Sequence, residues 1–188
     1  MDKRVNEYFK EIYHFIVHDD SIWSWLVNIL LAFLIVKFMI YPVLALVLGS
    51  QLPLVAVISG SMEHNGQSFD EWWIDNGDWY VENGITKEMF NEYRFTNGFN
   101  KGDVIVLVGE DNPMQGDVLV YKSSTHSYPI IHRVTYINDE GNTFQFKGDN
   151  NAGIDPADVN EEQLIGKALL KIPYIGWIKI WFSQLIGM

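Results

Sequence analysis

A run of apolar residues from Trp23 to Leu48 constrains the fold of this chain more than any other feature of its sequence. A helix of this length can cross a hydrocarbon core of about 30 Å, and two tryptophans stand at its start, where interfacial aromatic residues are common. Lys37 and Pro42 interrupt the run, and a lysine at mid-depth is unfavourable unless it snorkels or pairs. The run is too long, and begins too far from the N-terminus, for a cleaved signal peptide. We therefore predict a transmembrane helix over residues 23–49.

Basic residues precede this run but do not follow it closely. Segment 1–22 holds three of them, whereas none occurs between Leu48 and Lys87. The positive-inside rule then puts the N-terminus in the cytoplasm and everything after Gly49 outside it. We expect a single-pass protein of the cell membrane with a cytoplasmic N-terminus and an extracytoplasmic main domain.

Apolar residues in segment 1–22 recur at close to the spacing of an amphipathic helix. Val5, Tyr8, Phe9 and Ile12 follow this spacing, and charged residues fill the other face. Such a helix either packs on its own domain or lies on the membrane surface. The sequence leaves both alternatives open.

The composition of the 188-residue chain excludes several kinds of function. There is no cysteine, so thiol nucleophiles, disulfides and cysteine-ligated zinc are ruled out. The formal net charge of −11 argues against a nucleic-acid role, because phosphate binding needs clustered lysine and arginine. We expect one modest domain besides the N-terminal segments.

Short runs rich in β-branched and aromatic residues follow the apolar helix. We predict strands within residues 52–58, 103–109, 117–122, 129–137, 143–147 and 164–171. A glycine-containing turn at 138–142 should join two of them into a hairpin. No long helical period occurs in residues 102–171, so we expect segment 50–171 to be a mainly β domain.

Residues 66–101 differ in composition from the rest of this domain, because acidic and aromatic residues are interspersed there. We expect a short helix from Lys87 to Tyr93, capped by Thr86. We interpret the stretch as an inserted surface lobe with its own aromatic cluster and no catalytic part. A lobe that faces the membrane or a partner is the alternative.

Segment 172–188 is apolar and has Trp177, Trp181 and Phe182 around Lys179. It is short for a full membrane span. An interfacial helix, a partial membrane segment and a tail packed on the core all fit this composition. We favour contact with the membrane.

One set of side chains in the outer domain combines the residue types of a serine hydrolase. Ser61 follows Gly60 on an expected tight turn, and His132 lies in an expected strand. Asp149 and Asp155 lie in a loop rich in glycine and asparagine. Serine needs a base to take its proton, an imidazole with its ordinary pKa of about 6.5 suits that task, and a carboxylate must hold the other imidazole N–H. Each residue alone is more often structural than catalytic, so the hypothesis depends on the whole set.

These residues lie in sequence boxes that resemble a known family. The boxes are Ser59-Gly60-Ser61-Met62-Glu63, Gly116-Asp117-Val118, Pro129-Ile130-Ile131-His132-Arg133-Val134 and Lys147-Gly148-Asp149-Asn150-Asn151 with Asp155. In order and spacing they resemble type I signal peptidases of the archaeal and endoplasmic-reticulum branch, which use histidine where bacterial members use lysine. The stretch Ile172–Trp177 is also similar to that branch. The chain departs from the family at His64, where proline is usual, and in residues 65–100, which have no counterpart in the shortest members.

The resemblance implies a membrane-bound serine endopeptidase that removes N-terminal signal peptides from exported proteins, on a mostly antiparallel β catalytic domain. Carried over by position, Ser61 is the nucleophile, His132 is the general base and Asp155 is the favoured acid of the triad. Asp149 supports the site or shares the role of Asp155. The Ser61 backbone N–H and the Ser59 hydroxyl would form the oxyanion hole.

The resemblance implies neither a cofactor nor a metal. The expected partners are preproteins and the lipid bilayer, with the protein-export channel as a further candidate and no nucleic acid. Two rival interpretations stay open. One is a self-cleaving Ser/Lys hydrolase with Lys122 or Lys147 as base, and the other is a membrane-tethered binding module whose serine is only a turn residue.

Overall fold

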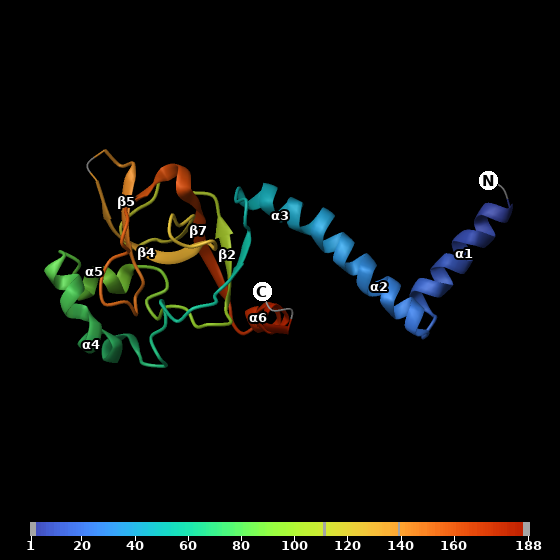
Figure 1. The fold of residues 1–188 in the computed structure, drawn as a ribbon, viewed down its shortest axis with the longest axis horizontal. Helices are drawn as coiled ribbons and strands as arrows, with labels where there is room; N and C mark the ends of the chain where they lie inside the picture. The colour runs from blue at the N-terminus through green and yellow to red at the C-terminus, as the bar shows by residue number, and fades with distance from the viewer. Residues whose placement is uncertain (1–2, 111, 139, 186–188) are drawn as a thin grey trace. The chain divides into compact units, whose positions relative to one another are not determined.

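The computed structural model describes residues 3–110, 112–138 and 140–185, and the chain divides into two compact units, residues 1–47 and 48–188 (Figure 1). Among the described residues, one helix is long and apolar enough to cross a membrane, and it runs from Ile22 to Leu48. It comprises α2 (Ile22–Ile35), the π-helical η1 (Val36–Ile40) and α3 (Tyr41–Leu48). Pro42 has no N–H to donate to the preceding turn, and the helix widens there instead of ending. This helix occupies the run for which the sequence predicts a transmembrane segment.

Helix α1 (Lys3–Val17) precedes it in the first unit. The Ser24 hydroxyl donates to the Phe15 carbonyl at 2.6 Å, and the Asn28 amide donates to the Ile16 carbonyl at 2.8 Å. These bonds fix the turn between α1 and α2. Most apolar side chains of α1 are exposed within this unit, as Phe9 illustrates at 63 %, whereas Phe15 and Ile16 are half-buried.

The second unit is built on one sheet. In the part of the chain that the structure describes, seven strands pair in the order β1-β2-β7-β3-β4-β5-β6, and every pairing is antiparallel. The strands are β1 (Leu54–Ala56), β2 (Val104–Val108), β3 (Val118–Tyr121), β4 (Ile130–Ile137), β5 (Thr143–Lys147), β6 (Val159–Asn160) and β7 (Leu164–Ile172). The expected mainly β, antiparallel domain is confirmed.

Each of the six predicted strand runs contains a strand, and β4 and β5 form the expected hairpin. Residue 139 of its turn lies outside the described residues. The two-residue β6 was not predicted, because so short a strand has no period to recognise. The 3₁₀ turn η2 (Glu161–Gln163) follows it directly.

Strand β3 lies between two hydrophobic cores. Val118 and Val120 belong to one core, and Leu119 and Tyr121 belong to the other. Because successive strand residues point to opposite faces, alternate residues of β3 serve the two cores. β4 is paired to β3 with His132 opposite Leu119, so the well-packed β3 fixes the position of the neighbouring histidine.

Two helices form the lobe within residues 66–101, α4 (Phe69–Glu82) and α5 (Lys87–Glu92), drawn in green in Figure 1. The lobe has its own buried core of Trp72, Tyr80, Ile85 and Phe90. Helix α5 begins after Thr86 as expected, and the Thr86 hydroxyl accepts from the Met89 N–H at 3.3 Å. The longer α4 was not predicted, although the sequence carries its start signal, a reciprocal capping box between Ser68 and Glu71.

The C-terminal helix α6 (Gly176–Leu185) has ten residues, about half of what a membrane span needs. The Gly176 N–H donates to the Gly102 carbonyl at 2.8 Å, and Ile180 is buried. Trp181 and Phe182 are 67 % and 63 % exposed. One side of α6 therefore packs on its own domain while an apolar side stays uncovered. Residues 186–188 of the expected C-terminal segment lie outside the described residues.

Candidate active site

Hydrogen bonds to its backbone carbonyl groups hold the turn that carries Ser61. The Asn150 N–H donates to the Ser61 carbonyl at 2.8 Å, and the Asn150 side-chain amide donates to the Gly60 carbonyl at 3.0 Å. The next residue, Met62, is fully buried in the core and accepts the Phe99 N–H at its carbonyl. Ser61 therefore lies on a short bend between the buried Met62 and the loop of residues 148–151.

Gly148 permits this close approach. A Cβ atom at this position would lie 2.7 Å from the Ser61 carbonyl oxygen and 2.8 Å from His132 Nε2. Any side chain there would push the loop away from the serine and the imidazole.

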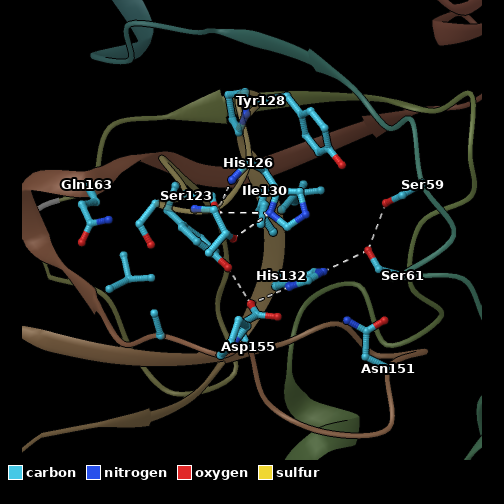
Figure 2. Close-up of a pocket in the computed structure, with 18 of the residues that line it drawn as sticks. Ser59, Ser61, Ser123, His126, Tyr128, Ile130, His132, Asn151, Asp155 and Gln163 are labelled. Carbon is cyan, nitrogen blue, oxygen red and sulfur yellow. Dashed lines mark hydrogen bonds and ion pairs between the residues drawn. The ribbon is translucent and has the colours of Figure 1, made fainter.

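Figure 2 shows Ser61, His132 and Asp155 in one hydrogen-bonded chain. His132 Nε2 lies 2.9 Å from Ser61 Oγ, and His132 Nδ1 lies 2.6 Å from Asp155 Oδ2. The imidazole is almost buried, at 5 % exposed. With Nδ1 protonated and bonded to the carboxylate, Nε2 is free to accept the serine proton.

Tyr121 joins this hydrogen-bonded series at Asp155, and the sequence did not predict its role. Its hydroxyl donates to Asp155 Oδ2 at 2.6 Å, and its ring stacks on Phe146. Burial, together with the negative charge of Asp155, raises the pKa of Tyr121, so the hydroxyl stays a donor. Nothing in the sequence of β3 distinguishes Tyr121 from an ordinary core residue.

Ser59 lies beside the expected nucleophile. Its Oγ is 3.1 Å from Ser61 Oγ (Figure 2). A hydroxyl at this distance can donate to an oxygen that develops charge next to Ser61.

Asp149 faces away from the imidazole and pairs with Arg133. Arg133 Nε and Nη2 donate to the two Asp149 carboxylate oxygens at 2.9 and 2.8 Å, and both side chains are fully buried. His64 Nε2 lies 3.2 Å from the same carboxylate, and the Tyr80 hydroxyl donates to it at 3.3 Å. Burial would raise the pKa of Asp149, but the Arg133 charge and the His64 bond hold it well below its usual range. The two acids that the sequence left as alternatives therefore have different partners.

The two lysines considered as rival bases are Lys147 and Lys122, and the described bonds of the Lys147 amine do not include Ser61. Lys147 Nζ donates to the Gly148 carbonyl at 3.2 Å and lies 4.6 Å from the centre of the Tyr80 ring. Burial lowers the pKa of Lys147 to about 8. Lys122 is exposed, and its backbone N–H pairs with Gln163.

A groove of about 500 Å³ opens in front of Ser61 and His132. Residues 55–59 line one wall, and residues 123–126, 128–131 and 153–159 contribute to the others. Because β1 is the terminal strand of the sheet, this wall continues from an unpaired strand edge.

Comparisons with known proteins show the family of this chain. No family model matches the chain. It is 30 % identical over 157 residues to the signal peptidase complex catalytic subunit sec11 of Schizosaccharomyces pombe, which covers 78 % of this chain and 76 % of that protein. It is 28 % identical over 159 residues to the subunit of the same name from Candida tropicalis, covering 78 % and 75 %. The chain belongs to the signal peptidase family. The resemblance found in its sequence boxes, to the archaeal and endoplasmic-reticulum branch of type I signal peptidases, is thereby confirmed.

Proposed function

We propose that the chain is a membrane-bound serine endopeptidase that cleaves N-terminal signal peptides from exported proteins. The observation that carries the proposal is the bonded series from Ser61 through His132 to Asp155 at the head of a groove, in a chain of the signal peptidase family. No step of the reaction below uses a cofactor.

Ser61 Oγ attacks the carbonyl carbon of the scissile peptide bond while His132 Nε2 takes its proton. Asp155 holds Nδ1–H and stabilises the imidazolium that forms. The oxyanion is bound by the Ser61 backbone N–H and the Ser59 hydroxyl, and each such donor is worth about 3 kcal/mol. The imidazolium then gives its proton to the leaving amine, and water, activated by the same imidazole, hydrolyses the acyl-enzyme. Tyr121 acts through Asp155, as a positioning residue.

The groove suits an extended peptide. A substrate strand that runs along residues 55–58 would pair with backbone groups at the edge of β1, and its alternate side chains would point into the groove. The family resemblance implies small residues at the first and third positions before the cut. Ala56 and Ser59 lie on this wall.

The apolar helix from Ile22 to Leu48 serves as the membrane anchor in this proposal, with the N-terminus in the cytoplasm and the sheet domain outside. The exposed apolar side of α6 contacts the bilayer surface. Protease added to the outside of spheroplasts should then digest the sheet domain. Digestion confined to segment 1–22 would overturn this orientation.

The partners of the proposed enzyme are preproteins, the lipid bilayer and other protein subunits. The relatives are named as catalytic subunits of a signal peptidase complex. We therefore propose that this chain also acts beside further subunits, and that the protein-export channel delivers its substrates.

A Ser/Lys hydrolase is the rival that uses the same serine. The 2.9 Å contact between His132 and Ser61 speaks against it, as do the bonds of Lys147 to its own loop. A non-catalytic binding module would have no need for the His132–Asp155 bond.

Cleavage of a preprotein by the detergent-solubilised full chain tests the proposal. Wild type should release the mature protein, and Ser61→Ala should not. Ser127→Ala, which changes an exposed serine that is not part of the groove lining, is the matched control and should cleave normally. A wild type that cleaves no preprotein, or a Ser61→Ala variant as active as wild type, would overturn the proposed function.

A further inference from the structure

We infer that the lobe formed by α4 and α5 is a positioning device for the active site, and that Tyr80 and His64 are its contacts with the loop that holds Ser61. The inference rests on the proposed function. It changes the expectation from sequence that residues 66–101 have no part in catalysis.

The first step is the connection between the lobe and Asp149. Tyr80, in α4, is fully buried, and its hydroxyl donates to Asp149 Oδ1 at 3.3 Å. The same hydroxyl accepts from Lys147 Nζ at 3.4 Å. Through this one buried hydroxyl the lobe contacts both Asp149 and Lys147, the last residue of β5.

The second step is His64, which stands where the family usually has proline. Its ring is 2 % exposed and stacks on Trp72 of α4, with ring centres 4.0 Å apart and planes 4° from parallel. Nε2 bonds Asp149, while Nδ1 is buried without a hydrogen-bond partner among the described residues. The Trp72 stack and the Asp149 bond therefore set the orientation of this ring.

Gly98, near the end of the lobe, packs closely against the same histidine. It has a φ of +61°, and a Cβ there would lie 2.0 Å from the Met62 carbonyl and 2.7 Å from the His64 ring. Only glycine adopts this conformation readily and leaves this space. The end of the lobe therefore packs against Met62 and His64, which closely follow Ser61 in the sequence.

The third step is the set of contacts between the lobe and Arg133, which is the neighbour of His132 in β4. Its guanidinium donates to the carbonyls of Arg94 and Phe95 at 3.0 Å each, and lies 4.5 Å from the Phe90 ring centre. These are lobe residues. Apart from the Gly116 carbonyl, the described hydrogen-bond partners of the Arg133 guanidinium are Asp149 and the lobe.

The last step leads from Asp149 to the nucleophile. Asp149 is followed by Asn150, whose two N–H groups bind the carbonyls of Gly60 and Ser61. A buried carboxylate that loses a donor must move or take up water, because an unpaired buried charge is strongly unfavourable. Movement of Asp149 would carry Asn150 with it and shift Ser61 relative to His132.

The test compares variants of the full chain in detergent. Tyr80→Phe removes only the hydroxyl, and His64→Ala removes the bond to Asp149. His64→Gln keeps an N–H donor at a similar position. Ile85→Val is the matched control, because Ile85 is buried in the lobe core and is a member of the cluster formed by Trp72, Tyr80 and Phe90.

We expect Tyr80→Phe and His64→Ala to lower kcat roughly 10- to 100-fold, the effect of a small misplacement of reacting groups, with KM changed less than about twofold. His64→Gln should recover most of the lost kcat. Ile85→Val should lower Tm without changing kcat. A kcat loss that follows Tm in all four variants, or normal kcat in Tyr80→Phe and His64→Ala, would overturn the inference.

Hydrogen exchange of the Asn150 amide supplies a readout that does not depend on cleavage. It should speed up in Tyr80→Phe and His64→Ala but not in Ile85→Val, because that amide donates to the Ser61 carbonyl. If wild type cleaves no preprotein, the proposed function fails, and the exchange comparison still decides whether the lobe holds the loop. Unchanged exchange at Asn150 in both variants would overturn the inference.

Discussion

The Tyr121 hydroxyl and His132 Nδ1 bind the same oxygen, Oδ2 of Asp155, each at 2.6 Å. Tyr121 comes from β3 and His132 from β4, so the carboxylate joins two neighbouring strands at the site. Because both bonds end on this one oxygen, the carboxylate cannot rotate away from the imidazole without breaking them.

Tyr121→Phe should therefore weaken catalysis while the fold persists. A hydrogen bond to a charged group contributes about 1.5–3 kcal/mol, so we expect kcat to fall roughly 10- to 100-fold. The measurement is kcat and KM on a signal-peptide substrate, with Tyr136→Phe, an exposed tyrosine of β4 that is not part of the groove lining, as control. Equal rates for the two variants would contradict a role for Tyr121.

Asp155→Ala should abolish most turnover. The imidazole loses the group that fixes its tautomer and stabilises its charged form, and comparable sites then lose about 10⁴-fold in kcat. Steady-state kinetics with a parallel thermal melt would separate this effect from unfolding. Near-normal turnover in Asp155→Ala would transfer the role to another acid, with Asp149 the first candidate.

Asp149→Ala should act mainly on stability. It leaves the Arg133 guanidinium buried without its carboxylate, and breaking such a pair costs about 3–5 kcal/mol. The free energy of unfolding, measured by urea titration of the full chain in detergent, should fall by about that amount. A variant as stable as wild type would show that water or another group compensates Arg133.

The contribution of Asp149 should also depend on pH. Its pKa is held well below the ordinary value of 3.8 in the folded state, so below that value the unfolded chain binds the proton first. The stabilisation is therefore complete at neutral pH and is lost as pH falls below about 4. Urea titrations between pH 7 and pH 2 should show a shallower loss of stability in Asp149→Asn than in wild type, and parallel curves would contradict the assignment.

The identity of the base can be read from activity against pH. The fall of activity at low pH reports protonation of the catalytic base. A Lys147 base would put the fall near its lowered pKa of about 8. Profiles of kcat/KM for wild type and Lys147→Met should coincide in their acid limb, and His132→Ala should be inactive. An inactive but folded Lys147→Met beside an active His132→Ala would favour the Ser/Lys rival.

The exposed side of α6 can be tested with a single label, because the chain has no cysteine. An environment-sensitive fluorophore on Phe182→Cys should shift to the blue when the full chain is reconstituted in lipid vesicles. Glu162→Cys, an exposed polar position in η2, is the matched control and should keep an aqueous spectrum. Identical aqueous spectra at the two positions would show that α6 does not contact the bilayer.

Local patterns in the sequence were sufficient for much of this fold. The apolar run at 23–48, the strand runs and the glycine turns each depend on residues close together in the chain, so their structure follows from composition and period. The helix α4 was also signalled locally, by Ser68 and Glu71, and its start could have been recognised. The candidate residues Ser61, His132 and Asp155 were recognisable from their types and from the order of their boxes.

Only the tertiary structure decided which of these residues meet. Both Asp149 and Asp155 lie in one short loop, and their different partners depend on how β5 and its loop pack against β3, β4 and the lobe. Tyr121 has the composition of a core residue, and only the pairing of β3 with β4 brings its hydroxyl to Asp155. Contacts such as Tyr80 with Asp149 join residues 69 positions apart. No local period encodes such a distance, because it results from the packing of whole elements against one another.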